Sequence, residues 1–157
     1  MTTDAMGCQK SIAETITSHG SDYLLQVKEN QPKLHAALKS AFFDTTDREF
    51  SRYFDHPSQM NNVGHGREEL RRCWVSKTID FIPMAHEWAK LSRIVVIELE
   101  RKIGDKESLD HRFYITSDLG RSAEQMLSAT RAHWGIESMH WMLDVAFHED
   151  MSLAINA

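Results

Sequence analysis

The sequence lacks the features that mark exported, membrane-spanning or disulfide-rich proteins. Its 157 residues hold two cysteines, Cys8 and Cys73, which lie far apart and form no CxxC pair. Two such thiols cannot build a zinc knuckle by themselves, and they suit a reducing compartment. No apolar run approaches the roughly 20 residues that span a bilayer, and the first residues show no signal-peptide pattern. We therefore expect a cytoplasmic protein with no membrane partner.

Low-complexity tracts, internal repeats and disordered linkers are also missing. The composition, with 41% hydrophobic and 26% charged residues, is typical of a globular chain. This length allows one domain of ordinary size or part of a larger protein.

Positive charge is scarce overall, because the net charge is −5. This argues mildly against a stand-alone nucleic-acid binder, whose affinity normally depends on Lys and Arg. However, residues 28–80 hold nine basic residues against eight acidic ones, and residues 121–157 hold two against five. A neutral-to-basic middle with an acidic C-terminal segment would suit phosphate binding by one part and metal binding by the other. An ordinary acidic protein would show the same pattern.

The most distinctive stretch is Arg131 to Asp150, RAHWGIESMHWMLDVAFHED, which has the hydrophobic period of a helix. Opposite its apolar face runs a polar stripe at spacings of three and four: His133, Glu137, His140, Asp144 and His148. Side chains at these spacings can converge on one ion, so one hypothesis is a metal site that uses His133, Glu137 and His140 directly. The alternative is an exposed polar face.

The start of the chain predicts a strand end, a helix and a second strand. Residues 11–18 form an amphipathic pattern closed by Gly20, and residues 22–28 (DYLLQVK) have the composition of a buried strand. Such a βαβ order favours a parallel pair in an α/β sheet. Asp4 would then lie at a strand tip, where α/β sheets place catalytic groups, or it would simply cap the helix.

The middle of the chain predicts mainly β structure. A helix is expected over residues 33–43, and strands are expected over residues 69–78, 94–99 and 111–116. Within residues 50–77, turn chemistry occurs at His56-Pro57, Asn61-Asn62 and Gly64-His65-Gly66. Gly104-Asp105 predicts a hairpin between the last two strands. The final helix is expected to begin near Ala123 and to continue through the polar stripe, with a break conceivable at Gly135.

Asp4 and Glu137 are two carboxylates from distant positions of the sequence. Two-metal phosphoryl transfer requires such carboxylates to hold its ions, together with a third acidic ligand. We therefore consider this chemistry as a hypothesis for the pair.

Five segments in order, TTDAMGCQKSIAETI, SDYLLQVKENQ, GHGREELR, HRFYITSDL and RAHWGIESMHWMLDVAFHED, carry a family resemblance. Over nearly the whole chain, the sequence resembles the C-terminal half of DDE transposases of the H-repeat-associated insertion-sequence family. The resemblance implies cutting and joining of DNA strands with Mg²⁺ (or Mn²⁺), with Asp4 and Glu137 as metal ligands. It also implies an α/β fold with a partial ribonuclease H-like core at 1–32, a β-rich insertion at 33–118 and the catalytic helix at 119–157.

The family pattern places its first catalytic Asp before the position of Asp4, where this sequence shows only Met1-Thr2-Thr3. We therefore expect the chain alone to be impaired in catalysis. The alternative function is a non-catalytic remnant that binds DNA or pairs with a full-length transposase. The expected partners are transposon-end DNA and either a second copy or a full-length transposase.

Several further residues are candidates for DNA contact or for support of the metal ligands. Loops or turns where side chains could approach phosphates contain Lys28, Asn30, Gln31, His65 and Arg67. Arg71 and Arg72 come shortly after Arg67 in the sequence and are further candidates. Arg131 is also a candidate for DNA contact, and it would neutralise charge near the metals. Those expected near the metal ligands, without holding an ion, are His133, His140 and Asp144.

Overall fold

The computed structural model describes residues 10–132, which form a mixed α/β structure around one five-stranded sheet. In chain order the elements are α2 (Lys10–Ser18), β1 (Leu24–Val27), α3 (Pro32–Phe43), α4 (Asp47–Tyr53), β2 (Ser58–Gly64), β3 (Arg67–Val75), the 3₁₀ helix η1 (Ala85–Glu87), β4 (Arg93–Ile103), β5 (Lys106–Thr116) and α5 (Ala123–Ala132).

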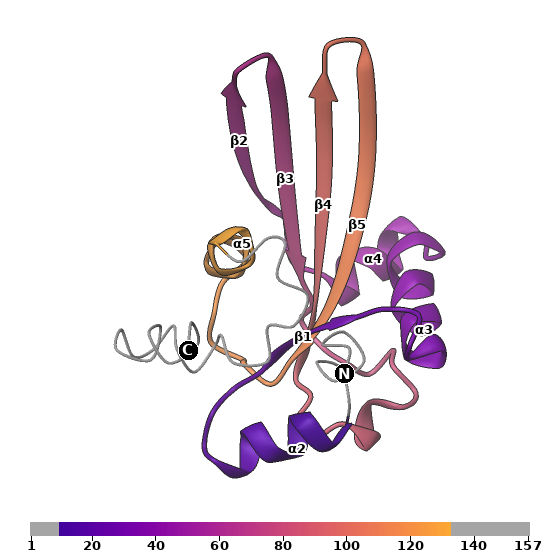
Figure 1. Cartoon of the computed structure of the whole chain (residues 1–157). Helices are drawn as coiled ribbons and strands as arrows, with labels where there is room; N and C mark the ends of the chain where they lie inside the picture. The colour runs from indigo at the N-terminus through magenta and orange to yellow at the C-terminus, as the bar shows by residue number, and fades with distance from the viewer. Residues whose placement is uncertain (1–9, 133–157) are drawn as a thin grey trace.

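The sheet has the order β1-β5-β4-β3-β2, and every pair in it is antiparallel. Two long hairpins, β2–β3 and β4–β5, project together from the helical base of the molecule (Figure 1). The short strand β1 pairs only with the C-terminal half of β5, where Leu24 faces Thr116 and Val27 faces Phe113. The hairpins therefore extend beyond the part of the sheet that the helices cover.

Tight two-residue turns close both hairpins. In the β2–β3 turn, His65 and Gly66 have φ angles of 51° and 78°, and in the β4–β5 turn Gly104 has a φ of 60°. Positive φ values of this kind match the right-handed twist of the paired strands. Each turn consequently fixes the register between the two strands of its own hairpin.

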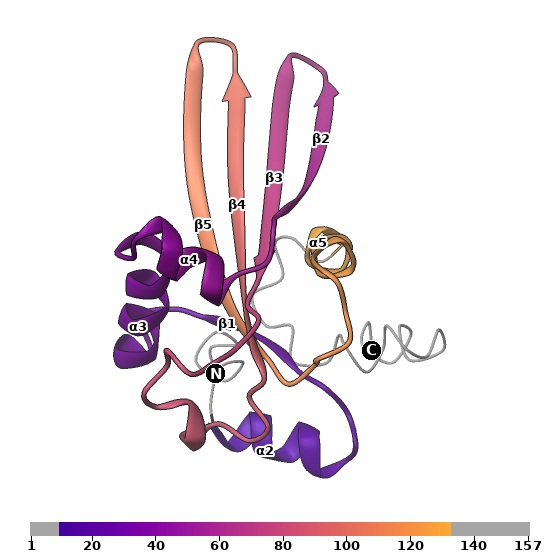
Figure 2. The ribbon, with the colours of Figure 1, turned by 180° about the vertical axis from the view of Figure 1, so that it is seen from behind.

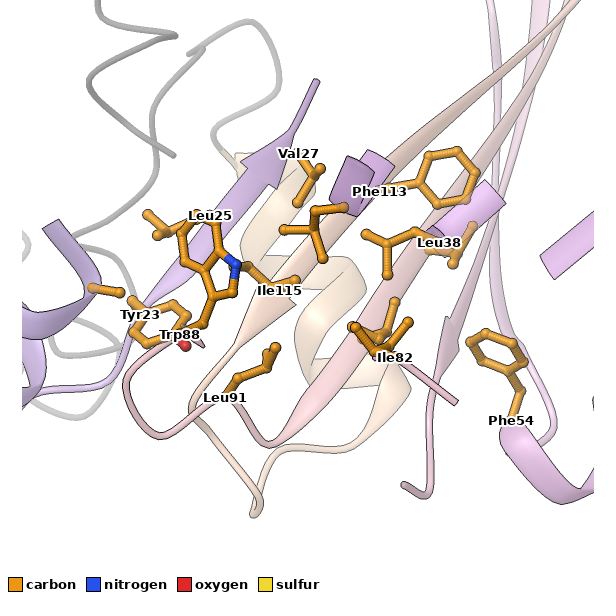
Figure 3. Packing of buried hydrophobic residues seen from close by; sticks show 14 residues of the cluster. Tyr23, Leu25, Val27, Leu38, Phe54, Ile82, Trp88, Leu91, Phe113 and Ile115 are labelled. Atoms are coloured by element: carbon orange, nitrogen blue, oxygen red, sulfur yellow. The ribbon is translucent and has the colours of Figure 1, made fainter. Parts of the chain in front are cut away.

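One face of the sheet is covered by α2, α3, α4 and the connection that precedes β4. Side chains from these segments pack on Ile94, Val96, Phe113 and Ile115 of the central strands. Figure 3 shows this packing, with Leu38 of α3 close to Phe113 and Trp88 close to Leu25. We call this face the α3–α4 side.

The opposite face is covered by α5, which packs against β3 and β2. Met126 and Leu127 are buried there against Cys73, Val95 and other residues of the sheet. Figure 2, from behind, shows α5 on the other side of the hairpins from α3 and α4. We call this face the α5 side.

The structure confirms the helices expected at 11–18 and 33–43, the strand at 22–28, the hairpin across Gly104-Asp105 and a helix starting at Ala123. The strands expected at 94–99 and 111–116 are longer, because their polar ends pair with one another in the projecting hairpin. The strand expected at 69–78 is shifted to Arg67–Val75, since its register is set by the turn at His65-Gly66.

The turn expected at Gly64-His65-Gly66 is confirmed, since His65 and Gly66 connect β2 to β3. The turn expected at Asn61-Asn62 was wrong, because β2 occupies Ser58–Gly64. Its sequence, SQMNNVG, is polar, and its pairing with β3 makes it a strand. Helix α4 was not expected either. The parallel pair predicted around Asp4 involves residues outside those the structure describes. Within the described part of the chain, β1 is paired with β5 alone.

Candidate nucleic-acid interface

The predicted metal ligands Asp4 and Glu137 lie outside the described residues, as do His133, His140 and Asp144. Their geometry therefore stays a prediction. Between residues 10 and 132, no group of three or more His, Cys, Asp or Glu residues is arranged to hold a metal ion. Carboxylate oxygens are nevertheless the donors that Mg²⁺ prefers, so the chemistry of Asp4 and Glu137 fits that ion.

Lys28, Asn30 and Gln31 lie where β1 turns into α3. The N–H of Gln31 donates to the carbonyl of Lys28 over 3.0 Å, and Gln31 is the N-cap of α3. Asn30 is exposed, whereas Lys28 and Gln31 are half-buried. This turn is at the base of the molecule, away from the hairpin tips in Figure 1.

His65 and Arg67 lie at the tip of the β2–β3 hairpin. Both are exposed, and Arg67 begins β3 opposite Gly64 and Ile103. The six predicted DNA contacts therefore lie in three separate places. Three are in the β1–α3 turn, two are at the tip of the β2–β3 hairpin, and Arg131 is on α5.

Arg131 lies in the last turn of α5, and its electrostatic neighbours are arginines of the sheet. Burial lowers the pKa of Arg71, Glu69 opposes this change, and the charges of Arg131, Arg101 and Arg112 lower it further. Those three guanidinium groups are therefore close enough to Arg71 to repel it. We call Arg71, Arg101, Arg112 and Arg131 the arginine cluster.

The register explains how the strands bring these arginines together. Arg71 faces Met60 on β2 and Leu99 on β4, and Arg101 lies diagonally adjacent because it faces Glu69. Arg112 faces Ile97 on the other side of β4. Alternation along each strand directs all of them to the α5 side.

The two acidic residues on the α5 side each accompany an arginine. Arg101 Nε donates to Glu69 Oε2 over 2.9 Å, and Arg112 Nε lies 3.8 Å from Asp110 Oδ2. The strand residues of this side also include Arg67 and Lys106, so its charged groups are mainly basic.

The α3–α4 side of the same strands has the opposite balance. It carries Arg72 and Lys102 against four acids: Glu68, Glu98, Glu100 and Glu107. Arg72 lies 2.6 Å from Glu98 and 3.6 Å from Glu100, and Glu98 also contacts His111 over 2.9 Å. Arg72 therefore does not share the surface of Arg71, although the two are adjacent in the sequence.

A buried ion network fixes the segment that leads into α5. Asp118 is only 2% exposed and binds the guanidinium groups of Arg93 and Arg121. Its Oδ1 accepts from the backbone N–H groups of Gly120 and Arg121 over 2.7 and 2.8 Å. Burial lowers the pKa of Arg93, and the charge of Asp118 opposes that effect.

The neighbouring residues connect this network to β1. Thr116 Oγ1 donates to the carbonyl of Tyr23 over 2.7 Å, and Ser117 Oγ donates to Asp22 over 2.9 Å. The entrance to α5 is thus bonded to the strand that follows α2.

The sequence indicated part of the basic surface. It identified Arg67, Arg71, Arg72 and Arg131 as candidates, but it did not identify Arg101 and Arg112. Alternation alone would have separated Arg71 from Arg72, whereas the position of Arg101 and Arg112 requires the strand register.

No helix within residues 10–132 is long and apolar enough to cross a membrane.

A family model described as "Transposase DDE domain" matches residues 1–156. The chain is 41% identical over 157 residues to "Putative transposase YncI" of Escherichia coli O157:H7, covering 97% of this chain and 39% of the relative. It is 38% identical over 159 residues to "H repeat-associated putative transposase YhhI" of E. coli K12, covering 96% of this chain and 40% of the relative.

"Putative protein YbfL" of E. coli K12 is similar at 39% identity over 159 residues. The chain thus spans about two fifths of the length of the curated relatives it matches. No solved structure matches it significantly. The resemblance to H-repeat-associated transposases is confirmed by the family model and by these relatives.

Proposed function

Because this chain belongs to the transposase DDE domain family, we propose that it is part of a transposase that cuts and joins DNA strands with Mg²⁺, or with Mn²⁺ in its place. The observation that carries the proposal is the family match over residues 1–156, which includes both Asp4 and Glu137. The substrate would be transposon-end DNA, and a protein with this substrate would act in the cytoplasm.

Asp4 and Glu137 would hold the metal, as the resemblance implies. Bound Mg²⁺ would supply positive charge that stabilises the attacking and leaving oxygens of the phosphate. The chain's own contribution would be to orient the DNA and to position Glu137 through α5. The buried contacts of Asp118 with Arg93 and Arg121 support this second role, because they fix the start of α5.

We propose the domain division expected from the resemblance, with core segments at 1–32 and 119–157 and an insertion at 33–118. A partial ribonuclease H-like core is supported by the order of α2 and β1. The edge of β1 away from β5 has no neighbour among the described residues, so it could accept a parallel strand from the segment before Asp4. The inserted strands would then extend the sheet of the core.

The 157 residues alone are expected to be impaired in catalysis, because the family pattern assigns them two of three acidic ligands. A supercoiled plasmid carrying transposon ends, incubated with the chain and Mg²⁺, should show little cleavage. Efficient cleavage that Glu137→Gln abolishes would overturn the impairment and would support the role of Glu137.

Metal binding tests the ligands separately from cleavage. Water-proton relaxation with Mn²⁺ should show weaker binding in Asp4→Asn and in Glu137→Gln. The matched control is Glu107→Gln, which removes an exposed carboxylate at the start of β5. Equal Mn²⁺ affinity in all four proteins would reject Asp4 and Glu137 as ligands.

The basic α5 side of the sheet favours a second candidate, a non-catalytic protein that binds DNA or pairs with a second copy or a full-length transposase. DNA binding and co-purification with a full-length transposase would then be unchanged by Glu137→Ala and by removal of divalent metal. Loss of both DNA binding and co-purification in Glu137→Ala would reject this candidate.

A further inference from the structure

The α5 side of the sheet concentrates positive charge on an acidic protein. Arg131 on α5, Arg101 on β4 and Arg112 on β5 each lie within electrostatic range of Arg71 on β3. Arg67 continues the same face toward the hairpin tip. Arg67 and Arg131 are exposed, Arg101 and Arg112 are half-buried, and Arg71 is buried. The exposed and half-buried arginine side chains are therefore accessible from solvent at this surface.

The extent of the surface indicates a polyanion rather than a single small anion. Arg67 and Arg71 are four residues apart on one strand, which corresponds to about 13 Å. Arg71 and Arg112 are on strands separated by β4, which corresponds to about 10 Å. One phosphate ion could not contact all these positions, whereas the backbone of a nucleic acid presents phosphates at regular intervals.

The charges of the two sides favour one orientation on such a partner. On the α5 side, only Glu69 and Asp110 accompany the basic residues of the strands. On the α3–α4 side, acidic residues outnumber Arg72 and Lys102, and they would repel phosphates. Guanidinium groups also suit phosphate because their planar fork can donate two parallel hydrogen bonds.

We propose that the α5 side of the β2–β5 sheet holds the sugar–phosphate backbone of duplex DNA through Arg67, Arg101 and Arg131, with Arg71 and Arg112 adding to the positive field. This inference rests on the proposed function for the choice of DNA as the polyanion. Only six positions of the sequence separate Arg131 from Glu137. Six residues span at most about 20 Å, so the backbone limits the separation of Arg131 and Glu137 to about that distance.

The test compares two double variants of the full 157-residue chain with the same change in net charge. Arg67→Gln/Arg131→Gln alters the α5 side, and Arg72→Gln/Lys102→Gln alters the α3–α4 side. Binding to a fluorescent duplex of about 30 base pairs is measured in EDTA over a range of salt concentrations. For two lost phosphate contacts, we expect roughly 10- to 60-fold weaker binding near 0.1 M salt and a salt slope smaller by about 1.8.

The variant pair on the α3–α4 side should bind almost as tightly as the unchanged chain. Equal weakening by both pairs, or no weakening by the α5-side pair, would overturn the inference. Equally tight binding of polyglutamate would also overturn it, because that result would remove the preference for nucleic acid.

A second matched comparison uses Arg101→Gln and Arg72→Gln. Each removes one strand arginine that contacts a glutamate, Glu69 in one case and Glu98 in the other. Arg101→Gln should weaken DNA binding, and Arg72→Gln should not. Arg67→Lys/Arg131→Lys should retain most of the binding, which distinguishes loss of charge from loss of folding.

Failure of this inference and failure of the proposed function give different results. In one outcome, DNA binds through the α5 side, Glu137→Gln leaves this binding unchanged, and Asp4 and Glu137 bind no Mn²⁺. This outcome would reject the catalytic function and keep the DNA surface. Mn²⁺ binding by both carboxylates, with DNA binding insensitive to the arginine variants, would reject the surface and keep the function.

Discussion

The two sides of the β2–β5 sheet consist of the same strands, yet they differ in charge and in covering elements. The α5 side is mainly basic beyond its small apolar cluster, whereas the α3–α4 side combines a large aromatic core with an acidic outer half. Arg71 and Arg72 illustrate the difference. Arg71 is directed to the other arginines, and Arg72 contacts Glu98.

Net charge is therefore a poor guide to the partner of this chain. A value of −5 averages two surfaces of opposite sign. Residue alternation with period two keeps the charges apart, because each strand contributes every second side chain to each face.

The largest expected effect concerns the anchor of α5. Asp118→Ala should reduce the free energy of unfolding by about 3–5 kcal/mol, because it leaves the buried Arg93 and Arg121 without their carboxylate. Urea denaturation measures the change. The matched control, Glu100→Ala, removes a half-exposed partner of Arg72 and should cost about 0–1 kcal/mol. Equal losses would show that Asp118 is no more important than a surface pair.

The aromatic core of the α3–α4 side should give a similar or slightly smaller effect. Phe113 is 3% exposed, and Phe113→Ala should cost about 3–4 kcal/mol because a cavity replaces a buried ring. Leu109, on the same face and strand but 58% exposed, should lose less than about 0.5 kcal/mol in Leu109→Ala. Thermal and urea unfolding compare the two variants, and a large loss for Leu109→Ala would mean that a contact covers the outer hairpin.

A third prediction tests how firmly α5 covers its side. Burial raises the pKa of the Cys73 thiol, so the folded protein holds very little reactive thiolate. In a Cys8→Ser background, Cys73 should react with a disulfide reagent on the order of 100-fold more slowly than in urea, if opening costs about 3 kcal/mol. Rapid labelling of the native chain at mildly alkaline pH would show that α5 opens easily.

The smallest expected effect is a pH dependence on the α3–α4 side. Burial lowers the pKa of His35 from its ordinary value of 6.5, Lys39 lowers it further and Glu29 opposes them. The folded state therefore favours neutral imidazole. The stability from this preference is present above pH 6.5 and is lost as the pH falls through the lowered folded pKa.

His35 packs edge-on against Phe113, with ring centroids 5.8 Å apart. His35→Gln should reduce the stability loss between neutral pH and about pH 5 by a few tenths of a kcal/mol, since the ring is only partly buried. Urea midpoints at the two pH values measure this change, with the exposed His86→Gln as the control. An unchanged pH dependence would assign the loss to other groups.

Local patterns in the sequence predicted much of the fold. Apolar runs marked β1 and the buried part of β4, and Gly104-Asp105 indicated the hairpin that joins β4 to β5. Helix α4 also has a local signal in the sequence. Thr46 and Glu49 form a reciprocal capping box, in which Glu49 N–H donates to Thr46 Oγ1 over 3.2 Å and Thr46 N–H donates to Glu49 Oε1 over 3.1 Å.

The candidate interface was less predictable. Arg67 and Arg131 were expected to contact DNA from their positions next to a turn and before Glu137. Nothing local in the sequence connects them with Arg101 and Arg112, because the connection depends on strand register and on the side of the sheet that α5 covers.

The family of this protein, the presence of carboxylates at positions 4 and 137, and the alternation that separates Arg71 from Arg72 follow from the sequence alone. These properties depend on residue type and on local spacing. The tertiary structure was needed to show that β2 is a strand, that Asp118 fixes the entrance to α5, and that arginines from four elements share one surface. Those results depend on pairing and packing between distant residues, and no local pattern encodes such contacts.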